Sequence, residues 1–313
     1  MVTAIFAATL LAGVSCEYKD LEIGILRNSF SVSFVKKGGV ETSSTYRVVF
    51  YPADEETRQN ISKGYIAFDM TAEGQQINLP VGNYNVTAWN TDTEHVMVSD
   101  VEGSGNIVAT TPRSSSMSIA NIPAIMDSLY HGQPVLEYPD YMNHANIRNF
   151  RVKSGAGQQY LEIAPDSMVV SVHIKVEGIG GLSDATQIKG SLNNVAAKRY
   201  VNYDNLTTDS AVVLFDCYVD NGGNVCADID LFGLEPTDAE NLQHSLVLYF
   251  YLPEKNKYLA IDVTDQVQAA KEQDDVEITS DKTGVDLREY SRGASSFSLD
   301  IEQWQTEEII LGF

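Results

Sequence analysis

Short apolar runs that alternate with polar residues recur along most of this 313-residue chain. They are rich in β-branched and aromatic side chains, and glycine, asparagine, aspartate and proline separate them. This pattern predicts half-buried β-strands that pair in sandwiches. The predicted strands cover residues 46–51, 65–70, 84–89, 169–176, 211–215, 245–252, 297–301 and 309–311.

Helical patterns are few and short, and residues 264–271 form the clearest one. A Gly-Ala-Gly turn at 155–157 and Pro165 precede the long run that begins at residue 169, so a division near residue 165 is expected. The sequence thus predicts an all-β fold with a few short helices and two sandwiches, over residues 25–165 and 166–313. Each is of ordinary domain size.

The N-terminal segment ends its apolar run at Cys16, with small residues before it and charged residues after it. This is typical of a bacterial lipoprotein signal, and it predicts a signal peptide over residues 1–15, a lipid on the Cys16 thiol and a tether over residues 16–24. No basic residue precedes Lys19, although a secretory signal normally begins with one. The alternative is a buried N-terminal strand or helix, because the run is too short to span a bilayer.

Composition narrows the classes of partner. The net charge of −22 argues against binding to nucleic acids or to anionic lipid surfaces.

Apart from Cys16, the cysteines are Cys217 and Cys226, on either side of a predicted hairpin turn. A turn centred on Gly222 and Gly223 would place Cys226 opposite Val219, so a disulfide requires a longer or bulged loop, and two free thiols are the alternative.

No motif for catalysis or metal binding stands out. The histidines lack zinc-hydrolase spacing, and a pair of His131 and His144 is better explained by a structured loop. The acidic and amide residues between 220 and 230 have the chemistry of calcium ligands, but turn formation already explains them. Tyr138 and Tyr141 are the best candidates for an exposed aromatic pair. No metal or other cofactor is expected, and the protein is not expected to be an enzyme.

Three segments resemble the fimbrillin superfamily of Bacteroidales, in its lipoprotein anchor or minor-subunit branch. They are the Leu-Pro-Val-Gly-Asn-Tyr entry to a strand within residues 79–90, the Asp-Val-Thr-Asp segment at 262–267, and residues 293–304. The resemblance implies two tandem transthyretin-like β-sandwich domains and a lipid anchor in the outer membrane, facing the cell exterior. It further implies fimbrial partner subunits that assemble by β-strand addition.

Under this resemblance, the C-terminal segment is the candidate for strand exchange through Ile309, Ile310, Leu311 and Phe313. It is either the last strand of its own sandwich, which is favoured, or the part that pairs with a partner. The leading hypothesis is a cell-surface fimbrial anchor or accessory subunit. The alternative is a glycan- or protein-binding surface lipoprotein, and a third hypothesis is a surface hydrolase. The fold alone does not decide among these functions, because β-sandwiches host many of them.

Overall fold

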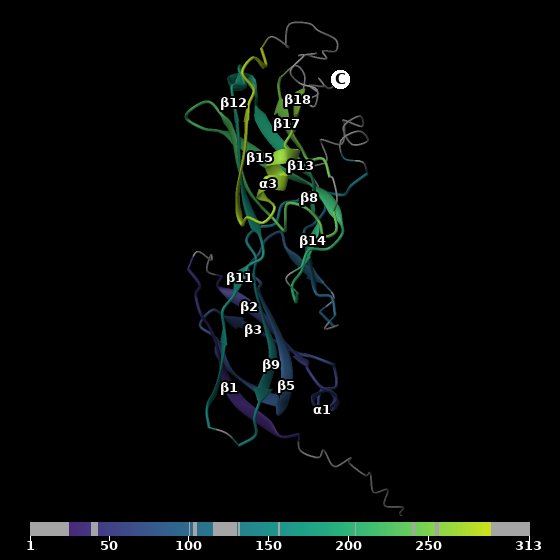
Figure 1. Ribbon diagram of the computed structural model, residues 1–313. Coiled ribbons are helices and arrows are strands. Elements are labelled where there is room, and N and C mark those ends of the chain that lie inside the picture. Colours follow the sequence, from purple (N-terminus) through teal and green to yellow (C-terminus); the bar gives the residue numbers. More distant parts are fainter. Residues whose placement is uncertain are drawn as a thin grey trace, which may run out of the picture.

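The protein is mostly β-structure with short helices, as the sequence predicts (Figure 1). The computed structural model describes residues 25–38, 43–99, 101–102, 105–114, 130, 132–155, 157–203, 205–239, 242–253 and 257–288. The predicted strands between residues 46 and 252 and the helix near 264 are confirmed. Cys16 and the predicted strands at 297–301 and 309–311 lie outside the described residues.

Two sheets from the first half of the chain share one hydrophobic core. One has the order β10-β1-β4, and the other has the order β11-β9-β5-β2-β3. Their strands are β1 (Arg27–Phe34), β2 (Thr45–Pro52), β3 (Ile66–Thr71), β4 (Gln75–Pro80), β5 (Gly82–Asn90), β9 (Asn143–Val152), β10 (Gln159–Ile163) and β11 (Asp166–Ser167). Helix α1 (Glu55–Gln59) begins after Asp54, whose side chain accepts a hydrogen bond from the backbone N–H of Thr57.

The alternation of β1 shows how the sequence builds this core. Phe30 and Val32 point inward and are fully or almost fully buried, whereas Ser29, Ser31 and Ser33, which alternate with them, lie on the other face. Phe30 meets Phe50 of the opposite sheet edge-to-face, with ring centroids 6.1 Å apart. The two sheets therefore pack face to face, as the alternating pattern predicts.

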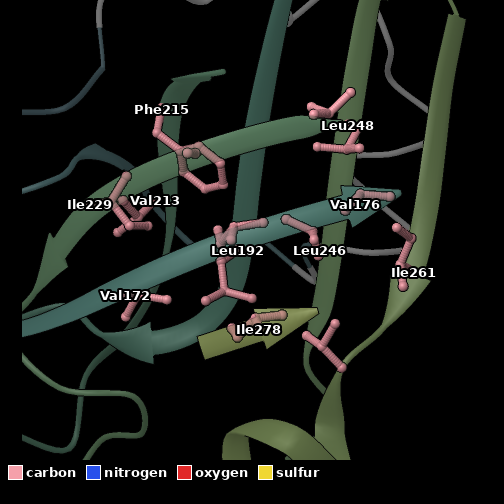
Figure 2. Packing of buried hydrophobic residues seen from close by; sticks show 14 of the residues in the cluster. Val172, Val176, Leu192, Val213, Phe215, Ile229, Leu246, Leu248, Ile261 and Ile278 are labelled. Carbon is pink, nitrogen blue, oxygen red and sulfur yellow. The ribbon is translucent and has the colours of Figure 1, made fainter. Parts of the chain in front are cut away.

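The second half forms a sheet of order β18-β17-β13-β15-β16-β12-β19, with β8 beside β15. The elements are β8 (Val135–Glu137), β12 (Val170–Glu177), β13 (Gln187–Ala196), β15 (Ser210–Val219), β16 (Val225–Leu231), β17 (Ser245–Tyr251), β18 (Lys257–Asp262), β19 (Asp275–Asp281), the 3-10 helix η2 (Leu182–Asp184) and α3 (Thr264–Ala270). Strand β15 pairs with β13 along residues 210–217 and with β16 only at 218–219, so it connects two parts of the sheet. Side chains from both parts, including Val172, Leu192, Phe215 and Leu248, fill one core (Figure 2).

A small sheet of order β14-β7-β6 lies where the two halves meet. Its strands are β6 (Met97–Ser99), β7 (Val108–Thr110) and β14 (Lys198–Tyr200). Strands β7 and β8 come from the first half of the chain, but they pair with β14 and β15 of the second half. A third cluster, which includes Trp89, Met168 and Phe232, packs the halves against each other.

Candidate functional site

Among the described residues, strand β18 ends the large sheet on one side. Its residues from Lys257 to Asp262 pair with β17. Leu259 and Ile261 pack into the main core, while Tyr258 and Ala260 pack into a cluster on the opposite face. Residues 258–261 carry no charge, and uncharged apolar edges are templates for pairing with another strand.

Strand β19, at the other end of the same sheet, is different. Val276 and Ile278 are fully buried, whereas Asp275, Glu277 and Asp281 are exposed. Charges along an edge strand oppose pairing with further strands. Of the two ends of this sheet, β18 is therefore the one suited to strand addition.

The chain leaves the described structure beside β18. Lys257, the first residue of β18, is 4% exposed, and its Nζ donates a hydrogen bond to the Leu287 carbonyl oxygen over 2.8 Å. The Leu287 N–H in turn donates to the Gly180 carbonyl over 2.9 Å. These bonds hold Leu287 beside the start of β18.

On the face of the large sheet opposite the main core, an apolar cluster surrounds Tyr130. Tyr130 is fully buried among side chains of β8, β15, β17 and β18. Its hydroxyl lies 2.6 Å from Ser191 Oγ and also contacts the Tyr249 hydroxyl. Burial raises the pKa of both tyrosines, so both stay neutral hydrogen-bonding groups.

A polar cleft of about 590 Å³ lies at the junction of the two halves. Its lining includes His144, Asp166, His173, Arg199 and Asp275. The cationic and acidic groups are largely engaged with the protein itself. Arg199, for example, donates to the Met168 carbonyl over 2.9 Å, so the lining supports the joint between the halves.

His173 connects three strands on the exposed side of this cleft. Its Nδ1 lies 2.5 Å from Asp228 Oδ1 on β16, and its Nε2 lies 3.2 Å from Asp275 Oδ1 on β19. Tyr218 donates to the other oxygen of Asp228 over 2.8 Å. The hydrogen bond with Asp228 raises the pKa of His173. The hydrogen bonds from His173, first, and from Tyr218 lower the pKa of Asp228. The hydrogen bond to Asp228 raises the pKa of Tyr218 to about 12. A tyrosine with a raised pKa is poorly suited to act as a nucleophile.

The other candidate residues have structural surroundings. His131 lies outside the described residues, and His144 is buried with its Nδ1 2.9 Å from the Val201 carbonyl oxygen. Asp220 accepts hydrogen bonds from the backbone N–H groups of Gly222 and Asn224, as a turn residue does. Within the described part of the chain, no group of histidine, cysteine and acidic residues is arranged to hold a metal ion.

The predicted aromatic pair is not an exposed platform. Tyr138 and Tyr141 are half-buried, and Tyr138 packs against the main core. Within the described part of the chain, the exposed tyrosines are Tyr160, Tyr203 and Tyr218, which belong to separate parts of the structure.

The disulfide considered from the sequence does not form, because Cys217 and Cys226 are free thiols. The expected register is also wrong, since Cys226 pairs with Tyr218 rather than with Val219. Cys217 packs against the main core. Val225 and Ala227, on either side of Cys226, also contribute to that core. Alternation therefore places the Cys226 side chain on the opposite face from Cys217.

Comparison with known proteins places the chain in a family. The model of a domain of unknown function, DUF5119, matches residues 15–216, which is more than half of the chain. The chain belongs to this family. No curated protein matches it. Among the described residues, no helix combines the length and apolar character needed to cross a membrane.

Several solved structures share the fold. A candidate adhesin from Bacteroides ovatus is 18% identical, with 80% of this chain and 92% of that chain covered and a TM-score of 0.59. The fimbrial anchor protein Mfa2 from Porphyromonas gingivalis is 10% identical, with coverage of 91% and 95% and a TM-score of 0.50. A DUF1812 structure from Bacteroides thetaiotaomicron, described as a candidate polysaccharide-binding protein, is 12% identical, with coverage of 80% and 89% and a TM-score of 0.51. The resemblance drawn from the sequence is thus confirmed as a likeness of fold.

Proposed function

We propose that this protein is a non-enzymatic cell-surface lipoprotein that acts as a fimbrial anchor or accessory subunit. The observation that carries the proposal is the fold shared with the anchor protein Mfa2 over 91% of this chain. A match of that extent includes both halves, so it supports a common architecture rather than one shared module. Strand β18, which ends the large sheet among the described residues and carries no charge at residues 258–261, is the proposed surface for joining subunits by strand addition.

The proposed attachment to the outer membrane is a lipid on Cys16. Residues 16–24 form the tether, and β1 begins at Arg27. Fully extended, the chain between Cys16 and Arg27 reaches about 35 Å, so the folded part stays close to the exterior membrane face. Cys16→Ala should abolish incorporation of labelled fatty acid and release the protein from membranes, whereas Cys226→Ala should change neither. A lipid-free wild-type protein would contradict the anchor.

The proposed domains are two transthyretin-like sandwiches over residues 25–165 and 166–313. Two separate core clusters support this division, one with Phe50 and one with Leu248 at its centre. Strands β7 and β8 tie the first domain to the second. Such a tie suits a subunit that must transmit force from a fimbria to a membrane anchor.

The direct test of function is the composition and order of purified fimbriae. Immunogold labelling should find the protein at the cell-proximal end of the fimbriae for an anchor, or along the shaft for an accessory subunit. Cells lacking the protein should release or shorten their fimbriae. Fimbriae of normal length, attachment and composition in those cells would refute the proposal.

A glycan-binding surface protein is the second candidate function. The fold shared with the candidate polysaccharide-binding protein favours it. Tyr203 is one of the exposed tyrosines; the Arg148 guanidinium lies over one face of its ring, 5.4 Å from the centroid, so a sugar would stack on the other face. Specific binding of the soluble protein to a glycan array, abolished by Tyr203→Ala, would favour this function over fimbrial attachment.

A further inference from the structure

We propose that one end of the first half rests directly on a phospholipid surface. This end, called the Leu26 surface below, consists of Ile25, Leu26, Arg27, Arg151 and Lys153. The two apolar side chains enter the interface of the bilayer, and the three cations contact headgroup phosphates. Its place in the cell rests on the proposed lipid anchor at Cys16, whereas its affinity for lipid does not.

The first support is the exposure of two adjacent apolar side chains. Leu26 is 69% exposed, more than any other large apolar side chain in the described part of the chain, and Ile25 is 44% exposed. The backbone at this point is fixed, because the Val81 N–H donates a hydrogen bond to the Leu26 carbonyl oxygen over 2.8 Å. The structure therefore holds apolar surface in water, where contact with a lipid interface would bury it.

The second support is a group of cations around Leu26. Arg27 begins β1, and the exposed Arg151 and Lys153 lie at the end of β9. The Lys153 N–H and Asn28 Nδ2 both donate to Gln159 Oε1, over 3.0 and 3.1 Å, so β1 and the end of β9 meet here. Within the described part of the chain, none of the three cations forms an ion pair. All three can therefore contact phosphate groups.

Acidic side chains at this end come from helix α1, and two of the three are engaged. Asp54 accepts a hydrogen bond from Asn83 Nδ2 over 2.6 Å, and Glu55 lies 3.7 Å from Arg58. Glu56 is the third. The exposed acidic row of β19, in contrast, belongs to the second half. The surplus of negative charge on the whole chain is therefore not concentrated at the Leu26 surface.

The third support is where the N-terminal chain enters the fold. The described chain begins at Ile25, and the start of β1 lies at the end of the first half that is far from the second half (Figure 1). Eight residues separate Cys16 from Ile25. A tether of this length spans at most about 30 Å. It gives the Leu26 surface an effective concentration at the bilayer in the millimolar range, so a modest affinity for lipid suffices.

Fluorescence quenching on vesicles tests the contact. The chain that begins at Cys16 is coupled through this thiol to a maleimide lipid in vesicles of phosphatidylcholine and phosphatidylethanolamine, with Cys217→Ala and Cys226→Ala to leave a single thiol. This coupling supplies the tether whether or not cells attach a lipid.

A tryptophan then reports which surface meets the bilayer, after subtraction of the emission of the two native tryptophans. Brominated acyl chains should quench about half of the emission added by Leu26→Trp, because an interfacial side chain reaches the acyl boundary. Val219→Trp is the matched control, since Val219 is 45% exposed in the second half, and its emission should stay unquenched. Unquenched emission at both positions would overturn the proposal.

Hydrogen exchange gives a readout without an introduced indole. Coupling to vesicles should slow exchange of the Val81 amide, which is bonded to the Leu26 carbonyl, about fivefold relative to the free chain. Leu26→Ser should abolish this slowing, and Arg27→Gln with Lys153→Gln should reduce it. Val219→Ser should leave it unchanged. Quenching of the tryptophan variant without slower exchange in the native sequence would show that the indole drives the contact, and would overturn the proposal.

Failure of this inference is distinguishable from failure of the proposed function. A protein that is found in purified fimbriae but whose Leu26 surface does not meet the vesicles refutes the lipid contact and leaves the fimbrial role intact. A protein whose Leu26 surface meets the vesicles but which is absent from fimbriae supports the lipid contact and refutes the fimbrial role.

Discussion

The buried pair of His244 and Glu235 allows a sharp test of how the second half is stabilised. The His244 side chain is fully buried, Glu235 is 15% exposed, and the imidazole Nε2 lies 3.0 Å from the Glu235 carboxylate. The other ring nitrogen lies 3.1 Å from the Asn193 carbonyl oxygen. The pair thus links the loop after β16 to the irregular part of β13 and to the start of β17.

Glu235→Ala removes one member and leaves a buried imidazole without its partner. Leaving a buried hydrogen-bonding group without its partner costs about 1–3 kcal/mol, and the full burial of the His244 side chain favours the upper end, about 3 kcal/mol. This is about a hundredfold in the folding equilibrium. Glu235→Gln keeps a hydrogen-bonding oxygen at similar volume and should cost about 1 kcal/mol.

Urea unfolding followed by far-ultraviolet circular dichroism measures these free energies. The control is the exposed pair of Arg47 and Asp69, which has two hydrogen bonds of 2.7 Å but side chains 42% and 61% exposed. Asp69→Ala should cost less than about 1 kcal/mol because solvent screens an exposed pair. Equal losses for Glu235→Ala and Asp69→Ala would refute the reasoning that burial sets the cost.

Three further predictions concern the second half of the chain. Asp228→Asn should bring the raised pKa of His173 back toward 6.5 in an NMR titration. The stability that this contact contributes is present below pH 6.5 and is lost as the pH rises through the raised folded-state pKa. An unchanged His173 titration in the variant would contradict the prediction. Gly190→Ala should lower the free energy of unfolding by about 1–3 kcal/mol, since the added Cβ would overlap the Phe215 ring. Phe215→Leu in the same chain should recover part of this loss in thermal melts. If it recovers none, the clash is not the cause. Leu192→Ala should lower the free energy of unfolding by about 2–5 kcal/mol, because this side chain is fully buried in the core of Figure 2. A loss below about 1 kcal/mol in urea unfolding would show that neighbouring side chains fill the cavity.

Local pattern was a reliable guide to individual strands. Residues 46–51 and 84–89 became β2 and β5, because both segments contain β-branched and aromatic residues, which fit the pleated surface of a sheet. Strand β13 was missed, since most of its residues are buried on both faces and it has no alternation to read. The short strands β7 and β8 were missed as well, because three-residue strands acquire their identity only from the partner beside them.

The candidate site depended more on tertiary structure. The cysteine pair illustrates the reason: a one-residue difference in register reverses the face of every side chain, and the register of the β15–β16 hairpin was not fixed by its turn sequence alone. The network of Tyr218, Asp228 and His173 likewise joins three strands that are distant in sequence. No spacing along the chain could have indicated it.

Strand composition and turn residues are local properties of the chain, so they sufficed to indicate the β-rich class, the position of several strands and the likeness to fimbrial proteins. Which uncharged strand ends a sheet, by contrast, became visible only in the folded chain, over the residues that the structure describes. That property of β18 depends on its neighbours, on the Tyr130 cluster against its outer face and on the Lys257 bond to Leu287. Edge exposure is a relation between strands, and no single strand sequence contains it.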